Sequence, residues 1–241
     1  MKRISLEVID STNQYAKSLP AFESRDLTLV TAEFQEAGRG SGSNIWESER
    51  SKNLLFSIMI SPRQLLTSRL FALSEVTSLA IFDALSSYTE GFRIKRPNDI
   101  YHNDKKIVGM LIENDLKGKQ VNHSIIGVGV NVNQTIFHGD APNPVSLAQI
   151  MGKEIDRNQV LDKILHHFTH YCSMMENGQY TVLHNLYMQH LYRRNALHTY
   201  ADEVGTFLAC VTDVEPSGHL VLECQNGEQR RYDFKEVKFI L

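Results

Sequence analysis

The chain has 241 residues, of which 42% are hydrophobic and 22% charged, and its formal net charge is −3. This length can bury one large core and one small one, and the composition is typical of a folded protein rather than a disordered one. The weakly negative balance gives no drive toward nucleic acid, and no apolar run approaches the roughly 20 residues of a membrane span, so we expect neither DNA nor a membrane as a partner.

The N-terminus and the cysteines indicate where the protein works. Residues 1–7 have a basic start but no apolar segment of the kind that secretory signals carry. Cys172, Cys210 and Cys224 are odd in number and widely spaced, which favours reduced thiols over a disulfide framework or a metal site. We therefore expect a cytoplasmic protein in which no metal is held by protein side chains alone.

A glycine-rich loop is the most informative segment. The run Leu27–Phe34 predicts a strand, and the loop after it ends at Trp46, the one tryptophan of the chain. Glycines let backbone N–H groups approach an anion, and an arginine among them clamps phosphate. The segment matches neither the dinucleotide fingerprint nor the P-loop, and alone it is equally typical of an ordinary surface loop. Its key residues are Gly38, Gly40 and Gly42, with Arg39 between the first two.

A helix and then a hairpin are predicted downstream. Apolar residues recur with a helical period over Thr67–Tyr88. Asn103-Asp104 is turn chemistry between two β-rich runs, which therefore form a hairpin. Gly109 within its second strand indicates close approach by a ligand or another backbone. The hairpin brings together Lys95, Asn98, Asp99 and Lys106, although an ordinary charged hairpin tip would also explain the adjacent lysines.

The run Ile125–Asn133 predicts a further strand. Gly127 and Gly129 are two residues apart and therefore lie on one face, which they leave free of side chains. Such a face accommodates a planar ligand, although a tightly packed core strand is a commoner cause of alternating glycines. In that second interpretation Asn131 and Asn133 only end the strand.

The C-terminal part changes from helical to β patterns. Asp156 is placed as the N-cap of a helix that ends near Gly178, and a further helix is predicted over Thr181–Leu191. From about Arg194, β runs at 207–214, 219–225 and 229–234 are separated by the turn dipeptides Ser217-Gly218 and Asn226-Gly227. We predict an α+β protein in which residues 1–193 form a large domain and residues 194–241 a small antiparallel barrel.

Five segments in this order resemble the catalytic domain of biotin protein ligases. They are Ser11-Thr12-Asn13, Gly38-Arg39-Gly40, Lys95-Arg96-Pro97-Asn98-Asp99, the stretch Lys105–Glu113 and the stretch Gly127–Asn131. The resemblance covers about residues 1–135. It implies a mixed sheet flanked by helices, as in class II synthetase-like ligases, and the C-terminal region is similar to the small SH3-like domain of the same family.

The resemblance implies a two-step reaction that uses ATP, Mg²⁺ and biotin. Biotin is first activated as biotinyl-5′-AMP and is then transferred to a lysine of a biotin carboxyl carrier protein. Relatives form homodimers through the edge of the central sheet, and the sequence leaves that state open. Because the Ser-Thr-Asn motif begins at residue 11, we expect no DNA-binding segment ahead of it and a ligase without repressor activity.

The resemblance also implies a role for each matching residue. Lys106 and Arg39 match the catalytic cations that offset the charges of the biotin carboxylate and the α-phosphate. The residues expected to bind biotin are Ser11, Thr12, Asn13, Gln35, Gly38, Gly40, Gly109 and Gly127. Those expected to bind ATP are Arg39, Trp46, Asn98, Asp99, Lys106, Gly129 and Asn131. Mg²⁺ is expected to be held mainly by phosphates and water.

Departures from the family pattern carry expectations of their own. The family loop usually bears further basic residues after the arginine, whereas this chain has Ser41, Gly42, Ser43 and Asn44, so we expect a weaker hold on biotinyl-AMP. Arg96 stands where the family usually has tryptophan, and it either restores charge missing from the loop or lies solvated at a strand end. Arg230, Arg231 and Lys235 either reach the nucleotide or the carrier, or form solvated strand edges.

Three other functions stay open at this point. Lipoate ligases and octanoyltransferases share the fold and the chemistry, but the Lys-x-Pro-Asn-Asp and Gly-Arg-Gly motifs and the β-rich tail favour biotin. A catalytically degenerate biotin-binding protein would explain the thinned basic loop, but it does not explain why Lys106 and Arg39 are retained. A nucleic-acid-binding module fits the charge balance least.

Overall fold

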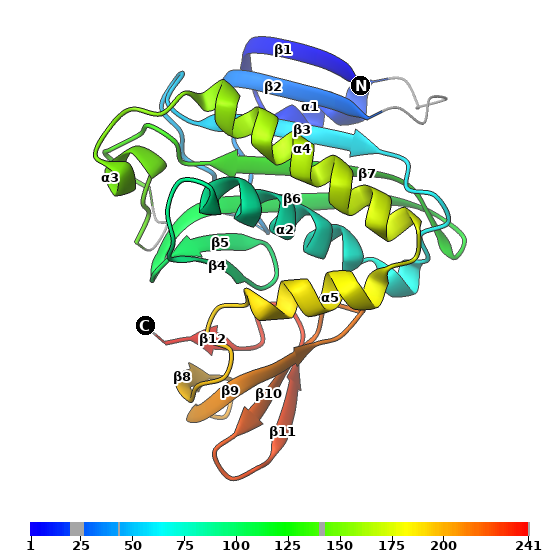
Figure 1. The fold of residues 1–241 in the computed structure, drawn as a ribbon, viewed down its shortest axis with the longest axis vertical. Helices are drawn as coiled ribbons and strands as arrows, with labels where there is room; N and C mark the ends of the chain where they lie inside the picture. The colour runs from blue at the N-terminus through cyan, green and yellow to red at the C-terminus, as the bar shows by residue number, and fades with distance from the viewer. Residues whose placement is uncertain (20–26, 43, 140–142, 241) are drawn as a thin grey trace.

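The computed structural model describes residues 1–19, 27–42, 44–139 and 143–240. Over these residues the larger part of the chain is built on a seven-stranded sheet in the order β1-β2-β3-β7-β6-β5-β4 (Figure 1). β1 runs parallel to β2 and the other neighbouring pairs are antiparallel, so the sheet is mixed, as predicted. The strands are β1 (Lys2–Ile9), β2 (Thr28–Gln35), β3 (Leu54–Ile60), β4 (Phe92–Lys95), β5 (Asp99–His102), β6 (Lys105–Lys117) and β7 (Gln120–Val130).

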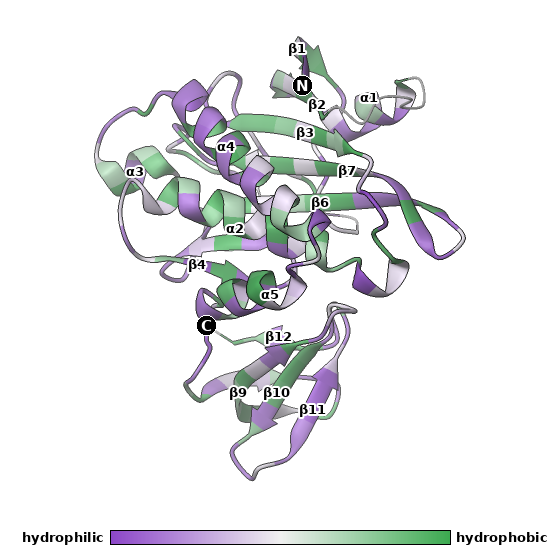
Figure 2. Cartoon of the chain, turned by 45° about the vertical axis from the view of Figure 1, so that its right-hand side comes forward, coloured by the Kyte–Doolittle hydropathy of each residue, from purple (hydrophilic) through white to green (hydrophobic). Residues whose placement is uncertain are grey.

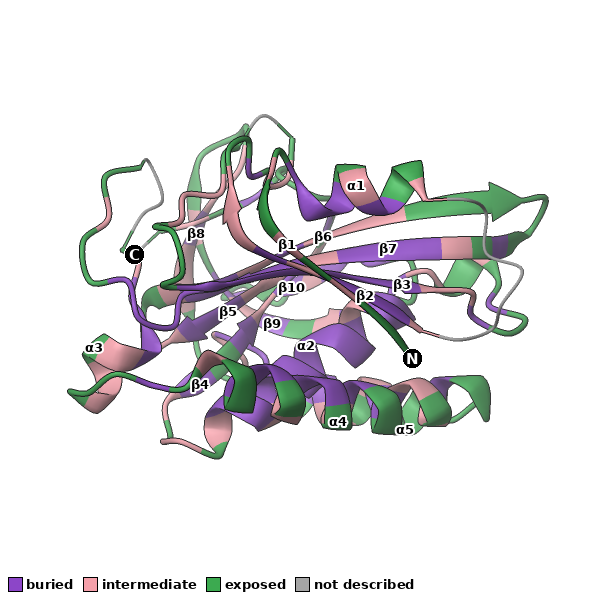
Figure 3. Ribbon diagram, turned by 90° about the horizontal axis from the view of Figure 1, so that it is seen from above, coloured by how far each residue is buried: buried purple, intermediate pink, exposed green. Residues whose placement is uncertain are grey.

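Helices cover both faces of this sheet. The short helix α1 (Thr12–Ser18) lies on one face, and α2 (Ala72–Ser86), α4 (Arg157–Glu176) and α5 (Tyr180–Gln189) lie on the other (Figure 3). This layering explains β3, in which residues 54–59 are all buried, because a strand covered on both faces is apolar throughout. A 3₁₀ turn, η1 (Thr67–Arg69), and a one-turn helix, α3 (Leu147–Met151), connect the larger elements.

The helices begin and end close to their predicted positions. Asp156 caps α4 as predicted, since its Oδ1 accepts a hydrogen bond of 2.8 Å from the backbone N–H of Asn158. The single helix predicted over Thr67–Tyr88 is wrong at its start, where η1 forms a separate turn before α2. No helix in the described ranges is long and apolar enough to cross a membrane.

The C-terminal part forms a second, five-stranded antiparallel sheet in the order β11-β10-β9-β8-β12. Its apolar strand β10 lies between neighbours, whereas β11 at one edge is mostly polar (Figure 2). The small sheet fits the predicted SH3-like domain, while the boundary between residues 193 and 194 stays a prediction. β8 and β12 were missed because runs of four and two residues are too short to show alternation. The bounds are β8 (His198–Ala201), β9 (Thr206–Val214), β10 (Leu220–Cys224), β11 (Gln229–Tyr232) and β12 (Lys238–Phe239).

Candidate active site

A cavity of about 1310 Å³ gathers the predicted site residues from both parts of the chain. Its walls are the start of α1, the loop after β2, the β4–β6 hairpin, β7 and the segment 234–240. Every residue predicted to bind or react lines it except one. The lining includes Ser11, Thr12, Asn13, Gln35, Gly38, Arg39, Gly40, Trp46, Asn98, Asp99, Lys106, Gly109, Gly127 and Gly129.

Asn131 is the exception. It is buried, its backbone N–H donates to Ile107, and its side-chain Nδ2 donates to the carbonyl of Val145 at 3.3 Å. The face shared by Gly127 and Gly129 does not extend to it, because β7 ends at Val130 and the chain turns there. The structure therefore does not bring Asn131 into the cavity with the other predicted residues.

The cavity has a neutral, hydrogen-bonding region at the start of α1. Gln35 Oε1 accepts from the backbone N–H of Thr12 at 2.7 Å and from its hydroxyl at 3.0 Å. The hydroxyl of Ser57, on β3, lies 2.7 Å from Thr12 Oγ1 and 2.6 Å from Asn13 Oδ1. Ser11, Thr12 and Asn13 are each only 3% exposed, and the hydrogen bonds among these side chains preorganise the region.

Asn13 is held from a second side by a charged pair. Its Nδ2 donates to Glu113 Oε2 at 2.9 Å, and the other carboxylate oxygen of Glu113 lies 2.6 Å from Lys17 Nζ. Burial alone would raise the pKa of Glu113, but the hydrogen bonds from Lys17 and Asn13 outweigh it and lower the pKa. Gly127 lies directly beneath Asn13, and a Cβ at this position would overlap the Asn13 amide.

A floor of glycines lies next to this region. Gly109 on β6 and Gly129 on β7 pair in register, and the indole of Trp46 lies over both. A Cβ on Gly109 would lie 2.7 Å from Trp46 Cζ3, and one on Gly129 would overlap the ring. The predicted side-chain-free face is therefore present, and an aromatic plane rests on it. Trp46 Nε1 is buried with no hydrogen-bond partner among the described residues.

The predicted anion loop is closed by backbone hydrogen bonds between its two ends. Trp46 N donates to Gly38 O at 2.9 Å, and inside this base Gly40 N donates to Asn44 O at 2.8 Å. Gly38 is required here, because a Cβ would lie 2.5 Å from the carbonyl oxygen of Trp46. Arg39 is exposed and lines the cavity from this loop. Ser43, the remaining position of the thinned loop, lies outside the described residues.

Beyond the glycines lies the cationic region. The hairpin forms as predicted, with Asn103 at a positive φ of 52°, and it pairs Asp99 with Gly109. Lys106 Nζ lies 2.7 Å from Asp99 Oδ1 and 5.8 Å from the centroid of the Trp46 ring. Asn98 is fixed to β6, since its Nδ2 donates to the carbonyl of Met110. Lysine, carboxylate and amide are thus presented together at one point of the cavity.

The C-terminal part supplies a further wall of the cavity, in contact with the hairpin. Lys95 Nζ lies 4.9 Å from the ring centroids of both Tyr101 and Phe239, and burial lowers its pKa. Lys235 also lines the cavity, and its Nζ is so close to the loop that a Cβ on Gly42 would lie 2.7 Å away. A second cation therefore stands beside the thinned loop, from a distant part of the sequence.

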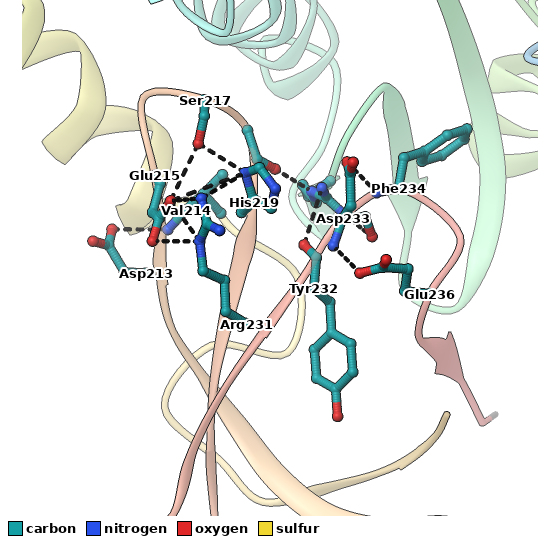
Figure 4. A network of polar contacts seen from close by, with 12 residues as sticks. Asp213, Val214, Glu215, Ser217, His219, Arg231, Tyr232, Asp233, Phe234 and Glu236 are labelled. Atoms are coloured by element: carbon teal, nitrogen blue, oxygen red, sulfur yellow. Dashed lines mark hydrogen bonds and ion pairs between the residues drawn. The ribbon is translucent and has the colours of Figure 1, made fainter. Parts of the chain in front are cut away.

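Arg230 and Arg231 form ion pairs away from the cavity. Arg231 Nε lies 2.8 Å from both carboxylate oxygens of Glu215, in a network that includes Ser217 and His219 (Figure 4). Arg230 pairs with Glu228 at 3.0 Å and with Asp202 at 3.3 Å. Neither residue lines the cavity, so the strand-edge interpretation holds for these two.

Arg96 corrects both interpretations made from the sequence. Its side chain is neither solvated nor directed at the loop, since the residue is only 7% exposed. The guanidinium donates to three backbone carbonyls of the C-terminal part, of which Gly218 at 2.7 Å is the nearest. The planar guanidinium has several N–H donors, so it can donate to several carbonyls at once, and these hydrogen bonds hold the side chain in place.

Comparison with known proteins agrees with this geometry. The profile of the Biotin/lipoate A/B protein ligase family matches residues 5–131. The chain belongs to this family. The bifunctional ligase/repressor BirA of Bacillus spizizenii is 32% identical over 234 residues, which cover 94% of this chain and 70% of the relative. The biotin–[acetyl-CoA-carboxylase] ligase of Paracoccus denitrificans is 27% identical over 234 residues, which cover 91% and 93%. The biotin protein ligase from Aquifex aeolicus in complex with biotin and ATP shares the fold, with a TM-score of 0.81 at 23% identity and 99% of each chain covered.

In this biotin/lipoate ligase family member, some residues of the site are not predicted from the sequence. Ser57 carried a signal, because it is a lone hydroxyl in the apolar run of β3. Phe239 and Glu47 carried none, since each acts through contacts with distant segments. In the parts of the chain that the structure describes, no group of three or more His, Cys, Asp or Glu side chains is arranged to hold a metal ion.

Proposed function

We propose that the protein is an ATP-dependent biotin protein ligase. It activates biotin as biotinyl-5′-AMP and transfers the biotinyl group to a lysine of a biotin carboxyl carrier protein. The proposal rests on one observation: a single cavity joins a neutral hydrogen-bonding region to a cationic region that contains Lys106 and Arg39. A neutral heterocycle with a carboxylate tail fits those two regions in that order.

The neutral region favours biotin over lipoate or octanoate. A ureido ring has N–H donors and a carbonyl acceptor, which match the side chains of Ser11, Thr12 and Asn13 on the cavity wall. A dithiolane ring or an alkyl chain has no such groups, so it would gain no hydrogen bonds from this region of the cavity. The relative from Paracoccus denitrificans, a biotin–[acetyl-CoA-carboxylase] ligase, points the same way.

The cationic region serves the first step. The biotin carboxylate attacks the α-phosphorus of ATP, and pyrophosphate leaves with the electrons of the broken P–O bond. Both reactants are anions, so Lys106 and Arg39 offset their repulsion and stabilise the charge that develops on the α-phosphate. The adenine packs by Trp46, whose indole rests on Gly129 and offers a flat aromatic surface.

Mg²⁺ would accompany the nucleotide. The donor set fits a hard cation that keeps most of its phosphate and water ligands, because Asp99 offers one carboxylate and Asn98 one amide on the cavity wall. The ion would screen the charge of the leaving pyrophosphate. The residues of the chain align the carboxylate and phosphate, which supplies much of the rate enhancement of a bimolecular step.

The second step requires a carrier lysine at the activated carbonyl. Its ε-amine attacks the carbonyl carbon, and AMP leaves. The carrier approaches through the mouth of the cavity between the loop after β2 and the segment 234–240, where Lys235 and Lys238 are exposed. We place this reaction in the cytoplasm, where ATP and biotin-dependent carboxylases occur together.

Biotin-dependent ATP–pyrophosphate exchange tests the proposal. We expect exchange with the wild type and a loss of about 10²–10³-fold with Lys106→Ala, the size typical of removing one charge-stabilising group. Lys105→Ala is the matched control, since this neighbouring lysine is exposed and does not line the cavity. Biotin binding without exchange would indicate a degenerate biotin-binding protein, and transfer of labelled lipoate or octanoate instead of biotin would assign the protein to those enzymes.

A further inference from the structure

Glu47 joins two walls of the cavity. Its Oε1 accepts from the backbone N–H of His138 at 2.9 Å, and its Oε2 accepts from the same group at 3.0 Å and from the N–H of Gly139. A side-chain amide, Gln134 Nε2, donates to Oε1 at 3.3 Å. A carboxylate is thus held by consecutive backbone N–H groups, an arrangement that receives anions well.

The partner segment is built to present these donors. Gln134 is fully buried, and its Oε1 accepts from Asn53 Nδ2 at 2.7 Å and from Glu49 N at 2.9 Å. Those two bonds fix the amide so that its Nε2 faces Ile136 O and Glu47. The residues that follow Trp46 are therefore tied to the segment 134–139 by a network rather than by a single contact.

Gly139 leaves no space for a side chain beside the Glu47 carboxylate. A Cβ at this position would lie 2.8 Å from Glu47 Oε2 and 3.6 Å from its Cβ. Any larger residue would push the carboxylate off its donors. Glycine at 139 therefore has a steric reason that does not depend on a left-handed backbone.

The carboxylate sits next to the aromatic plane of the site. Glu47 directly follows Trp46, and Trp46 N closes the anion loop on Gly38 O at 2.9 Å. Fixing Glu47 to His138 and Gly139 therefore fixes the exit of that loop and with it the position of the indole over Gly109 and Gly129. Glu47, His138 and Gly139 all line the same cavity as the indole.

We propose that Glu47 is a positioning residue that latches the exit of the Gly38–Trp46 loop to the segment 134–139 and so keeps the indole over the glycine floor. The loop of this chain has one cation, whereas the family loop usually carries further basic residues. By holding the indole in place, the latch makes up part of the retention of biotinyl-5′-AMP that those basic residues would provide. The retention part rests on the function proposed above, whereas the position of the indole does not.

Trp46 is the only tryptophan, so its fluorescence reports on the latch in the free protein. We expect acrylamide to quench Trp46 about twofold more strongly in Glu47→Ala, with Glu47→Gln in between, because an amide accepts weaker hydrogen bonds than a carboxylate does. Gly139→Ala should give the same result from the other side of the contact. Glu49→Gln is the control, because only the backbone of this exposed residue is used.

Retention is measured as the release rate of preformed biotinyl-5′-AMP. We expect release about tenfold faster in Glu47→Ala and in Gly139→Ala, while Glu49→Gln matches the wild type. Unchanged quenching in both variants would overturn the latch, and so would slower release or a lower KM for ATP, since these would show that the carboxylate blocks the site. If the wild type forms no adenylate, the proposed function fails, and the quenching comparison still decides the latch.

Discussion

The guanidinium of Arg96 donates a hydrogen bond of 2.7 Å from Nε to the backbone carbonyl of Gly218, a residue 122 positions away. Arg96 precedes Pro97, Asn98 and Asp99, the motif that we assign to the nucleotide side of the cavity, and Gly218 lies in the turn between β9 and β10. Tyr232 and Asp233 accept from the same guanidinium through their carbonyls. One side chain therefore ties the nucleotide-side motif to the small C-terminal sheet.

Arg96→Leu should destabilise the protein by about 2–3 kcal/mol, because it leaves buried carbonyls without their charged donor. For a chain of this size, such a loss lowers the melting temperature by about 4–10 °C. Arg96→Lys should recover part of it, since an ammonium cannot satisfy three carbonyls in the plane of a guanidinium. Arg93→Leu is the control, from an exposed position on the same strand β4. Equal melting temperatures for all of these proteins would contradict the role given to Arg96.

Local signals account for what could be predicted from the sequence. The Asn103-Asp104 turn, the cap at Asp156 and the alternating glycines each carry their information within a few residues, and the structure contains all three. The partners of Arg96, the approach of Phe239 to Lys95 and the latch at Glu47 join segments far apart in sequence. No periodicity or turn signal encodes such contacts, since they depend on how distant segments pack against one another.

Asp99→Asn should impair the nucleotide side alone. The change removes the carboxylate that pairs with Lys106 at 2.7 Å and that we assign to Mg²⁺. We expect exchange activity to fall about 10²-fold with a higher KM for ATP, while calorimetry gives an unchanged Kd for biotin. Asp115→Asn, on the exposed end of β6, should leave both constants alone. A matching loss of biotin affinity would place Asp99 at the wrong end of the cavity.

Gly127→Ala should weaken biotin binding through Asn13. The added methyl overlaps the Asn13 amide, which must then leave its partners Leu111 and Glu113. A cost of about 2 kcal/mol, close to a 30-fold rise in Kd, is typical of such overpacking. In an Asn13→Ala background the methyl has room, so the second substitution should cost little more. Isothermal titration of the single and double variants gives the answer, and simple additivity would rule out this contact as the cause.

Stability should depend on pH through His184. Its Nδ1 lies 2.8 Å from Glu75 on α2 and its Nε2 lies 2.9 Å from Asp213 on β9, so it bridges the helical layer and the C-terminal sheet. The hydrogen bond to Glu75 outweighs burial, which alone would lower the pKa, and it raises the pKa of His184 above the usual 6.5. A raised pKa in the folded state contributes stability that is complete below the unfolded pKa and is lost as pH rises through the folded one.

Melting temperatures of the wild type and His184→Gln should therefore differ more at about pH 6 than at about pH 9. The imidazolium is present only at the lower pH, where it attracts both carboxylates. His166→Gln serves as the control, because His166 is exposed on α4. A difference that stays constant over this range would mean that the bridge is made by neutral hydrogen bonds alone.

Ser41→Arg should slow the release of biotinyl-5′-AMP. Ser41 lines the cavity two positions after Arg39, the only cation of the loop, so an arginine there adds charge where we propose that the phosphate binds. At partly exposed sites such a charge contributes about 1 kcal/mol, which corresponds to roughly fivefold slower release at low salt. Salt screens the attraction between charges, over a length of about 10 Å at 0.1 M. The slowing of release should therefore diminish as salt is added. Ser41→Gln controls for length without charge, and equal release rates for the two variants would show that charge in this loop does not limit retention.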